Sequence, residues 1–243
     1  MSKYRKKFII PYYDGDKDGY IRPENLLAYL GETSNLHSDS IGLGLKELKS
    51  SNYCWILNRW RARFFKHPRV RDEITIETWC SGIDKFYASR EFAVYDKDED
   101  IIFKGSTQWV FLDLNKGRPV RVPEEVGKPY GECKDKLLED FYDFRKDYEV
   151  EKGLEFHVRR SDIDSNKHVN NVKYLNWILE AVPDDIVDKH RLYDLDIFYK
   201  KEVKQGNTIE SSILQDVKEL NPTFLHKITN EKEIHALGRT LWK

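Results

Sequence analysis

The sequence is poor in cysteine, in net charge and in long apolar runs, and each absence excludes a class of protein. Its 243 residues contain 3 cysteines, an odd number with no Cys-x-x-Cys spacing, which argues against a disulfide framework or a cysteine-rich metal site. A formal net charge of -1 argues against a general binder of nucleic acid or membrane surfaces. No apolar run approaches the roughly 18 residues of a membrane helix, and Met1–Phe8 lacks the features of a signal peptide. We therefore expect a reduced, cytoplasmic, soluble protein.

What the sequence does contain is enough apolar material for folded cores, divided into two halves. Hydrophobic residues make up 40% of the chain and aromatic residues 13%. Between Pro119 and Gly153 the sequence turns polar and charged, and proline and glycine interrupt any pattern. We expect an N-terminal domain over residues 1–130, a linker over 131–152 with a short helix at 137–148, and a C-terminal domain over 153–243.

Both halves show the same order of elements. In the first half, Pro23 precedes leucines at helical spacing, and in the second a helical pattern over 172–182 is closed by Pro183. Runs rich in β-branched and aromatic residues predict strands at 53–65, 73–80, 87–95, 101–114, 155–160, 194–203, 208–217, 223–229 and 234–242. Each half therefore reads as one long helix packed on an antiparallel sheet, which is an α+β fold.

The segment Asp14–Gly19 is similar to the start of an EF-hand calcium loop, with acids at the first, third and fifth positions and glycine at the sixth. Asn25 stands where such a loop needs a bidentate glutamate, and the preceding residues read as a strand. We interpret the segment as a polar turn before the first helix and expect no bound metal.

A basic run lies in the first half. Arginines alternate with apolar residues along a predicted strand, so their side chains would share one face. No acidic residue interrupts the run, whose basic members are Arg59, Arg61, Arg63, Lys66, Arg69 and Arg71. A solvated strand face and a docking surface for an acidic partner are both compatible with this pattern.

The turn before the second helix carries the densest group of chemically useful side chains. Asp164, Asn166 and His168 alternate, so an extended stretch would point them the same way. An amide can donate and accept hydrogen bonds, an imidazole can move a proton near neutral pH, and the helix that follows offers N–H groups to an oxyanion. The alternative is ordinary helix capping. No nucleophile elbow, P-loop or dinucleotide-binding fingerprint competes with this turn.

The segment Asp162–Asn176 resembles the signature of the acyl-ACP thioesterases, which release fatty acids from acyl carrier protein. Tyr199–Val203 lies where that family carries its second active-site segment. Further segments similar to the family's N-terminal half follow in order: Trp55–Trp60, Glu77–Trp79, Arg90–Phe92, Trp109–Leu114 and Arg118–Pro119. The resemblance spans nearly the whole chain.

The resemblance implies two tandem hotdog domains, each an antiparallel sheet wrapped around one long helix. The N-terminal domain would bind the acyl chain and the C-terminal domain would carry the chemistry. Asp164, Asn166 and His168 would be active-site residues, with Glu202 as an acid from the facing strand. The family often has cysteine after that glutamate, whereas this chain has Val203. A thiol nucleophile from this position is thereby excluded, and Glu202 is favoured as general base, or less so as nucleophile.

The implied activity is hydrolysis of acyl-[acyl carrier protein] thioesters, which ends fatty acid elongation and needs no cofactor because a thiolate leaves readily. Five members of the basic run would bind the acidic carrier: Arg59, Arg61, Arg63, Lys66 and Arg69. Two alternatives stay open, an acyl-CoA thioesterase and a non-catalytic hotdog module that binds acyl thioesters. The sequence leaves open the acyl chain length and whether the protein forms a homodimer.

Overall fold

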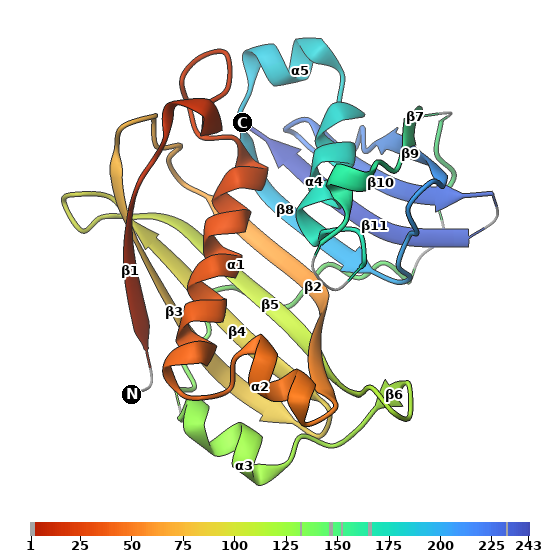
Figure 1. Cartoon of the computed structure of the whole chain (residues 1–243). Coiled ribbons are helices and arrows are strands. Elements are labelled where there is room, and N and C mark those ends of the chain that lie inside the picture. Colours follow the sequence, from red (N-terminus) through yellow and green to blue (C-terminus); the bar gives the residue numbers. More distant parts are fainter. Residues whose placement is uncertain (1–2, 132, 146–147, 152, 165–166, 232) are drawn as a thin grey trace. The chain divides into compact units, whose positions relative to one another are not determined.

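The structure, a computed structural model, describes residues 3–131, 133–145, 148–151, 153–164, 167–231 and 233–243 (Figure 1). The chain divides into two compact units, residues 1–139 and 140–243. Each unit is an antiparallel sheet with a helix over one face, which confirms the expected α+β fold.

The sheet of the first unit has the strand order β1-β3-β4-β5-β2, and the short β6 pairs with β5. All of these neighbours are antiparallel. The strands are β1 (Tyr4–Ile9), β2 (Tyr53–Phe64), β3 (Glu73–Asp84), β4 (Tyr87–Tyr95), β5 (Ile101–Asp113) and β6 (Arg118–Pro119). The strands predicted from periodicity agree with β2 to β5, except that β3 continues past Cys80 through a register shift.

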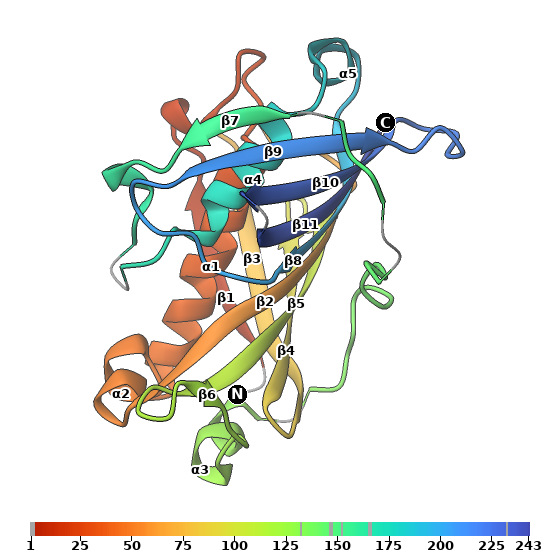
Figure 2. The same ribbon diagram turned by 90° about the vertical axis from the view of Figure 1, so that its right-hand side faces the viewer.

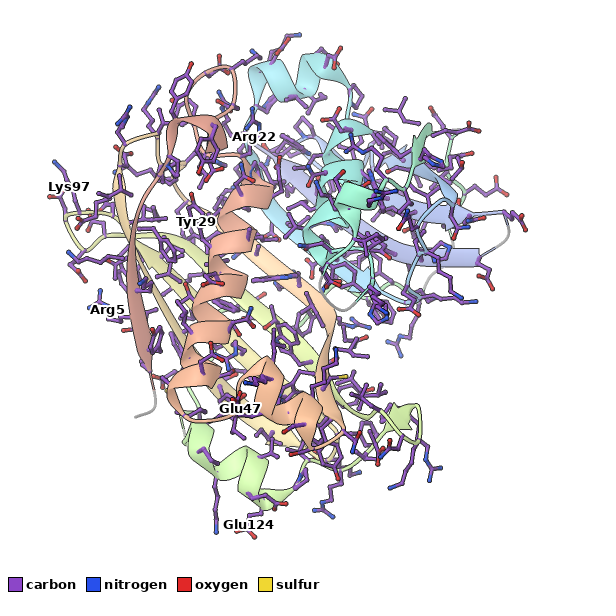
Figure 3. All side chains as sticks on the ribbon, in the orientation of Figure 1. Arg5, Arg22, Tyr29, Glu47, Lys97 and Glu124 are labelled. Carbon is purple, nitrogen blue, oxygen red and sulfur yellow. The ribbon has the colours of Figure 1, made fainter. Side chains whose placement is uncertain are left out.

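Helix α1 (Pro23–Ser40) lies across one face of this sheet (Figure 1). Proline at its first position begins the helix, because that residue needs no N–H partner there. Leu26, Leu30 and His37 belong to its buried stripe. Tyr29 of α1, which is labelled in Figure 3, stacks on Phe8 of β1, and the ring centroids are 4.9 Å apart. The shorter helices of this unit are η1 (Tyr12–Asp14), α2 (Leu45–Ser50), α3 (Glu124–Gly127) and η2 (Lys128–Tyr130).

The sheet of the second unit has the strand order β8-β11-β10-β9-β7 (Figure 2). Its strands are β7 (Leu154–His157), β8 (Leu192–Tyr199), β9 (Thr208–Gln215), β10 (Thr223–Asn230) and β11 (Glu233–Trp242). Its helices are η3 (Arg160–Asp162), α4 (Asn171–Glu180) and α5 (Asp184–Lys189).

Helix α4 approaches β11 closely, and glycine permits this. A Cβ built on Gly238 would lie 2.9 Å from Ile178 Cδ1, so a larger residue would require the Ile178 side chain to move. Tyr174, Leu175 and Trp177 are also buried on this helix. The predicted helical pattern over 172–182 therefore becomes the face of α4 that covers the sheet.

The connection between the units differs from the sequence-based expectation. The helix predicted at 137–148 is wrong, since the described residues of that segment contain none. Its backbone is instead bound by side chains: Leu137 N donates to Glu91 Oε2 at 3.2 Å, and Tyr142 N donates to Asp196 Oδ1 at 3.0 Å. These bonds hold the backbone outside helical geometry.

The buried carboxylate of Glu91 binds the start of the connection to the first unit by accepting a hydrogen bond from Leu137 N. Ser81 and Ser106 donate their hydroxyls to it, so the charge is compensated by hydrogen bonds. Trp79 Nε1 donates to the carbonyl of Asp135 at 2.8 Å. Further along, the Tyr148 hydroxyl donates to the carbonyl of His226 in the second unit at 2.9 Å. Side chains of both units thus hold the segment that we expected to be a linker.

The turn similar to an EF-hand uses its carboxylates locally. Asp16 Oδ1 accepts from the backbone N–H groups of Asp18 and Tyr20, each at 2.9 Å, and Asp14 accepts from the Tyr29 hydroxyl. Across the described ranges, no group of three or more His, Cys, Asp or Glu side chains is placed to hold a metal ion. None of the helices that the structure describes combines the length and the hydropathy of a membrane span.

Candidate active site

The candidate site begins with a tight turn ahead of α4. Ile163 and Val169 form an antiparallel bridge. Asp164 N donates to the carbonyl of His168 at 2.8 Å, and Asp164 Oδ1 accepts from His168 N at 3.2 Å. Lys167 adopts the left-handed conformation, with φ of 66°, that reverses the chain. Asp164 thus closes the turn that presents His168. Asn166 lies outside the described residues.

The start of α4 is capped by its own residues. Asn170 is the N-cap, and its side-chain oxygen accepts from Val172 N at 3.0 Å. Lys173 N donates to the Asn170 carbonyl at 2.8 Å. The N–H groups of Val172 and Lys173 therefore already have acceptors. The expected oxyanion site at this helix start stays a prediction. For Asn170 the alternative of ordinary capping is correct.

Glu202 lies on the loop after β8 rather than on a strand. Strand β8 ends at Tyr199, so the strand predicted to reach Val203 is too long. Chain direction changes there because Lys200 N and Lys201 N both donate to the carbonyl of His235, at 2.9 and 3.2 Å. The predicted facing of Glu202 and His168 is nevertheless present, since His168 Nε2 lies 3.0 Å from Glu202 Oε2. We refer to these two residues as the His168–Glu202 pair.

The His168–Glu202 pair is accessible to solvent. The side chains are 55% and 51% exposed, so water and a substrate can reach both without any opening of the core. The backbone beside Glu202 is by contrast fixed, because Val203 is 2% exposed and its N–H donates to the buried Tyr174 hydroxyl at 3.1 Å. The exposed His168–Glu202 pair therefore lies beside backbone that buried groups hold in place.

The sequence did not predict Tyr174 and His235, the residues that hold the backbone beside Glu202. The helical pattern over 172–182 assigns no role to Tyr174, although a buried tyrosine normally finds a partner for its hydroxyl. His235 Nδ1 lies 3.2 Å from the carbonyl of Lys201, and this histidine is 4% exposed. Only the position of Tyr174 within the signature-like segment could have indicated it. No local pattern connects His235 with the loop at 201.

All cysteines belong to the first unit and are free thiols. Burial raises the pKa of the Cys80 thiol, which is 6% exposed, and also raises the pKa of the half-buried Cys54. Both shifts disfavour the thiolate that a nucleophile or redox group requires. Val203, at the position where the family often has cysteine, is a buried packing residue.

The basic run is distributed over two environments. On β2, Arg59, Arg61 and Arg63 are half-buried and alternate with buried residues, so their predicted common face is confirmed. Lys66 forms an ion pair with Asp96 at 2.8 Å, and the guanidinium of Arg69 lies 4.0 Å from the centre of the Tyr20 ring. Lys66 and Arg69, two of the exposed cations of the run, are therefore already engaged within the chain.

Solved structures establish the class of fold. A Lactobacillus plantarum protein named as an oleoyl thioesterase is 26% identical to this chain with a TM-score of 0.90, and the match covers 100% of this chain and 96% of that one. An acyl-ACP thioesterase from Bacteroides thetaiotaomicron is 22% identical with a TM-score of 0.86, over 99% of this chain and 98% of that one. The two units are thus tandem hotdog domains, as expected.

The family follows from the sequence matches. Residues 1–130 match the acyl-ACP thioesterase N-terminal domain, and residues 145–243 match the acyl-ACP thioesterase C-terminal domain. The chain therefore belongs to the acyl-ACP thioesterase family. A chloroplastic acyl-[acyl-carrier-protein] hydrolase of Cuphea viscosissima is 27% identical over 259 residues, which cover 99% of this chain and 62% of that protein. This chain accordingly spans less than two thirds of the length of that relative.

Proposed function

We propose that this protein is a thiolester hydrolase that releases free fatty acid from acyl carrier protein. The observation that carries the proposal is the 3.0 Å contact of the His168–Glu202 pair, within the two segments that resemble the family's active-site segments. A carboxylate and an imidazole in contact, both open to solvent, can activate a water molecule without a metal or an organic cofactor.

In the proposed reaction, Glu202 takes a proton from water while the water oxygen bonds to the thioester carbonyl carbon. The tetrahedral intermediate then collapses, the carbon–sulfur bond breaks, and the departing thiolate takes the proton from Glu202, which restores the carboxylate. A carboxylate oxygen only accepts hydrogen bonds, so the contact requires a hydrogen on His168 Nε2. That nitrogen is then occupied and is no base for water, so only Nδ1 of His168 is left to accept a proton. We assign the base to Glu202 because the family resemblance favours it, with His168 as the group that orients it.

Asp164 and Asn166 complete the proposed site. Asp164 would act through the turn, since its contacts are to the backbone of His168. Asn166 stays a prediction from the sequence, in which its amide donates to the thioester oxygen or holds the water. The N-terminal domain, which has no Asn-x-His in its matching turn, would bind the acyl chain. The free cysteines fit a reducing compartment such as the cytoplasm.

Release of free fatty acid from a panel of acyl-ACPs tests the proposal, with the same acyl chains on coenzyme A as the comparison. Faster turnover of acyl-ACP at matched chain length is expected. Preference for coenzyme A would favour the acyl-CoA thioesterase instead. Binding of acyl thioesters with no release of fatty acid from either carrier would leave a non-catalytic module and overturn the proposal.

Removing every cysteine is expected to leave substantial activity. Cys54, Cys80 and Cys133 all lie in the first unit, and burial disfavours the thiolate of two of them. The triple Cys→Ser variant should retain acyl-ACP hydrolysis, apart from a loss caused by polar substitution at the buried Cys80. Circular dichroism verifies that the triple variant is folded. If the folded variant releases no fatty acid, a cysteine takes part in the hydrolysis.

The basic run gives a separate expectation about the carrier. Acyl carrier proteins are acidic, and exposed ion pairs contribute about 0.2–1 kcal/mol each, so several together mainly raise the encounter rate. The double variant Lys66→Glu/Arg69→Glu should lower kcat/KM for acyl-ACP several-fold at low salt. The loss should stay within several-fold because each cation already has a partner in the chain. An acyl-pantetheine substrate, which needs no protein docking, should be unaffected.

A matched control for this variant is Lys85→Glu/Lys134→Glu, which reverses two exposed lysines elsewhere in the first unit. The net charge change is the same in both variants, so a global charge effect would lower kcat/KM equally. Equal losses of kcat/KM in the two variants, or a loss that rising ionic strength does not weaken, would show that the basic run is only a solvated strand face.

A further inference from the structure

The Glu202 side chain is half exposed, yet it meets His168 at 3.0 Å. An exposed glutamate loses conformational entropy when it is held in one place, so some structure must restrict it. Apart from the contact with His168, the described contacts that do so are made by its two neighbours in sequence. Lys201 is held through its backbone by His235, and Val203 is held through its backbone by Tyr174.

The hydrogen bond from Val203 is of particular interest because it connects the loop to α4. Tyr174 is 3% exposed and Val203 is 2% exposed, so water does not compete for this bond. The Tyr174 ring is itself fixed by edge contacts with Trp177 and Tyr199, whose ring centroids lie 5.3 and 5.4 Å away. The acceptor oxygen therefore has a defined position.

Tyr174 and His168 belong to one continuous stretch of chain. The turn that presents His168 leads directly into the N-cap Asn170 and the first turns of α4. Burial, with a smaller contribution from the nearby charge of Glu202, raises the pKa of Tyr174 to about 12. The hydroxyl thus stays protonated at neutral pH, and its oxygen accepts from Val203 N through a lone pair.

We propose that Tyr174 is a positioning residue, whose hydroxyl fixes the backbone beside Glu202 and so sets the geometry of the His168–Glu202 pair. The inference rests on the proposed function, since placing this carboxylate affects turnover only if the carboxylate takes part in hydrolysis. Helix α4 then determines the positions of both members of the pair. It positions His168 through the preceding turn and Glu202 through the Tyr174–Val203 bond.

The test is Tyr174→Phe, which keeps the buried ring and removes the acceptor for Val203. We expect kcat on both acyl-ACP and acyl-pantetheine to fall about five- to tenfold, the change that corresponds to an ordinary hydrogen bond, with KM within about twofold. Amide hydrogen exchange at residues 200–207 should become faster, because the Val203 N–H loses its acceptor.

A double-mutant cycle separates positioning from simple packing. If Tyr174 acts through Glu202, then Tyr174→Phe should cost nothing further in kcat when Glu202 is already glutamine. Tyr199→Phe is the matched control. It removes the hydroxyl that donates to the Asn171 carbonyl at 3.2 Å, and any effect it has should persist in the Glu202→Gln background.

An unchanged kcat for Tyr174→Phe in an active enzyme would overturn this inference and leave the proposed function standing. Equal losses in both backgrounds would also overturn it, because they would identify Tyr174 as a packing residue only. A parent protein that hydrolyses no acyl thioester would instead overturn the proposed function, and the positioning role with it.

Discussion

Replacing Glu202 with glutamine is expected to lower kcat for acyl-ACP hydrolysis by roughly 10²-fold or more, the scale of a lost general base. Glutamine has nearly the same shape and can still meet His168, but it cannot take a proton from water. The side chain is 51% exposed, so the substitution should leave the free energy of unfolding almost unchanged. A folded protein with strongly reduced turnover is therefore the expected result.

His168→Ala should cause a loss of similar size, and the double variant should be little worse than either single variant, because residues that act as a unit are not additive. Glu219→Gln is a matched control, since Glu219 is also an exposed glutamate in an ion pair of the same unit, with Arg239 at 3.2 Å. Near-normal kcat in Glu202→Gln would exclude this carboxylate as the base. Additive losses would separate the roles of His168 and Glu202.

Much of the fold follows from local sequence patterns. Strands β2, β4 and β5 and helix α1 could be predicted because each combines a clear period with a definite start or stop, such as Pro23 at the first position of α1. The predicted helix at 137–148 failed because its backbone is bound by Glu91 and Asp196, which are distant in sequence. Periodicity contains no information about such partners.

The candidate site, like the fold, could be predicted only in part from the sequence. Asp164 and His168 lie in one short turn, so their alternation could be read directly. That Glu202 reaches His168 was expected from a family resemblance rather than from spacing, because 34 residues separate the two in sequence. The Tyr174–Val203 bond could not be predicted, since a tyrosine on a helix face gives no sign of which backbone N–H it will accept from.

The second unit is expected to lose stability in acid because of one buried histidine. His226 on β10 is fully buried; its Nε2 lies 2.9 Å from Thr240 Oγ1, while its Nδ1 has no hydrogen-bond partner among the described atoms. Protonation would place an unpaired N–H and a charge in the core, and burial accordingly lowers the pKa of His226 from 6.5 to about 3. The neutral imidazole is therefore the form that the folded unit requires.

The sign of the effect follows from proton binding. As pH falls from 6.5 towards 3, the unfolded chain binds a proton at His226, whereas the folded chain does not. The stability present above pH 6.5 is thus lost progressively, with a slope approaching about 1.4 kcal/mol per pH unit from this group. His37 has its pKa lowered to about 4, by burial first and then by Arg90, and it would produce a similar effect in the first unit.

Because His37 belongs to the first unit, the two units must be followed separately. Amide hydrogen exchange on β10, between about pH 4 and 5.5, reports the opening free energy of the second unit. His226→Gln cannot titrate but can still bond to Thr240, so its opening free energy should fall with acid less steeply than that of the parent, by about 1.4 kcal/mol per pH unit. The variant will also be less stable at neutral pH, since glutamine fills the site less well. That loss shifts the whole curve without changing its slope, so parallel curves for parent and variant would show that His226 is not the acid-sensitive group.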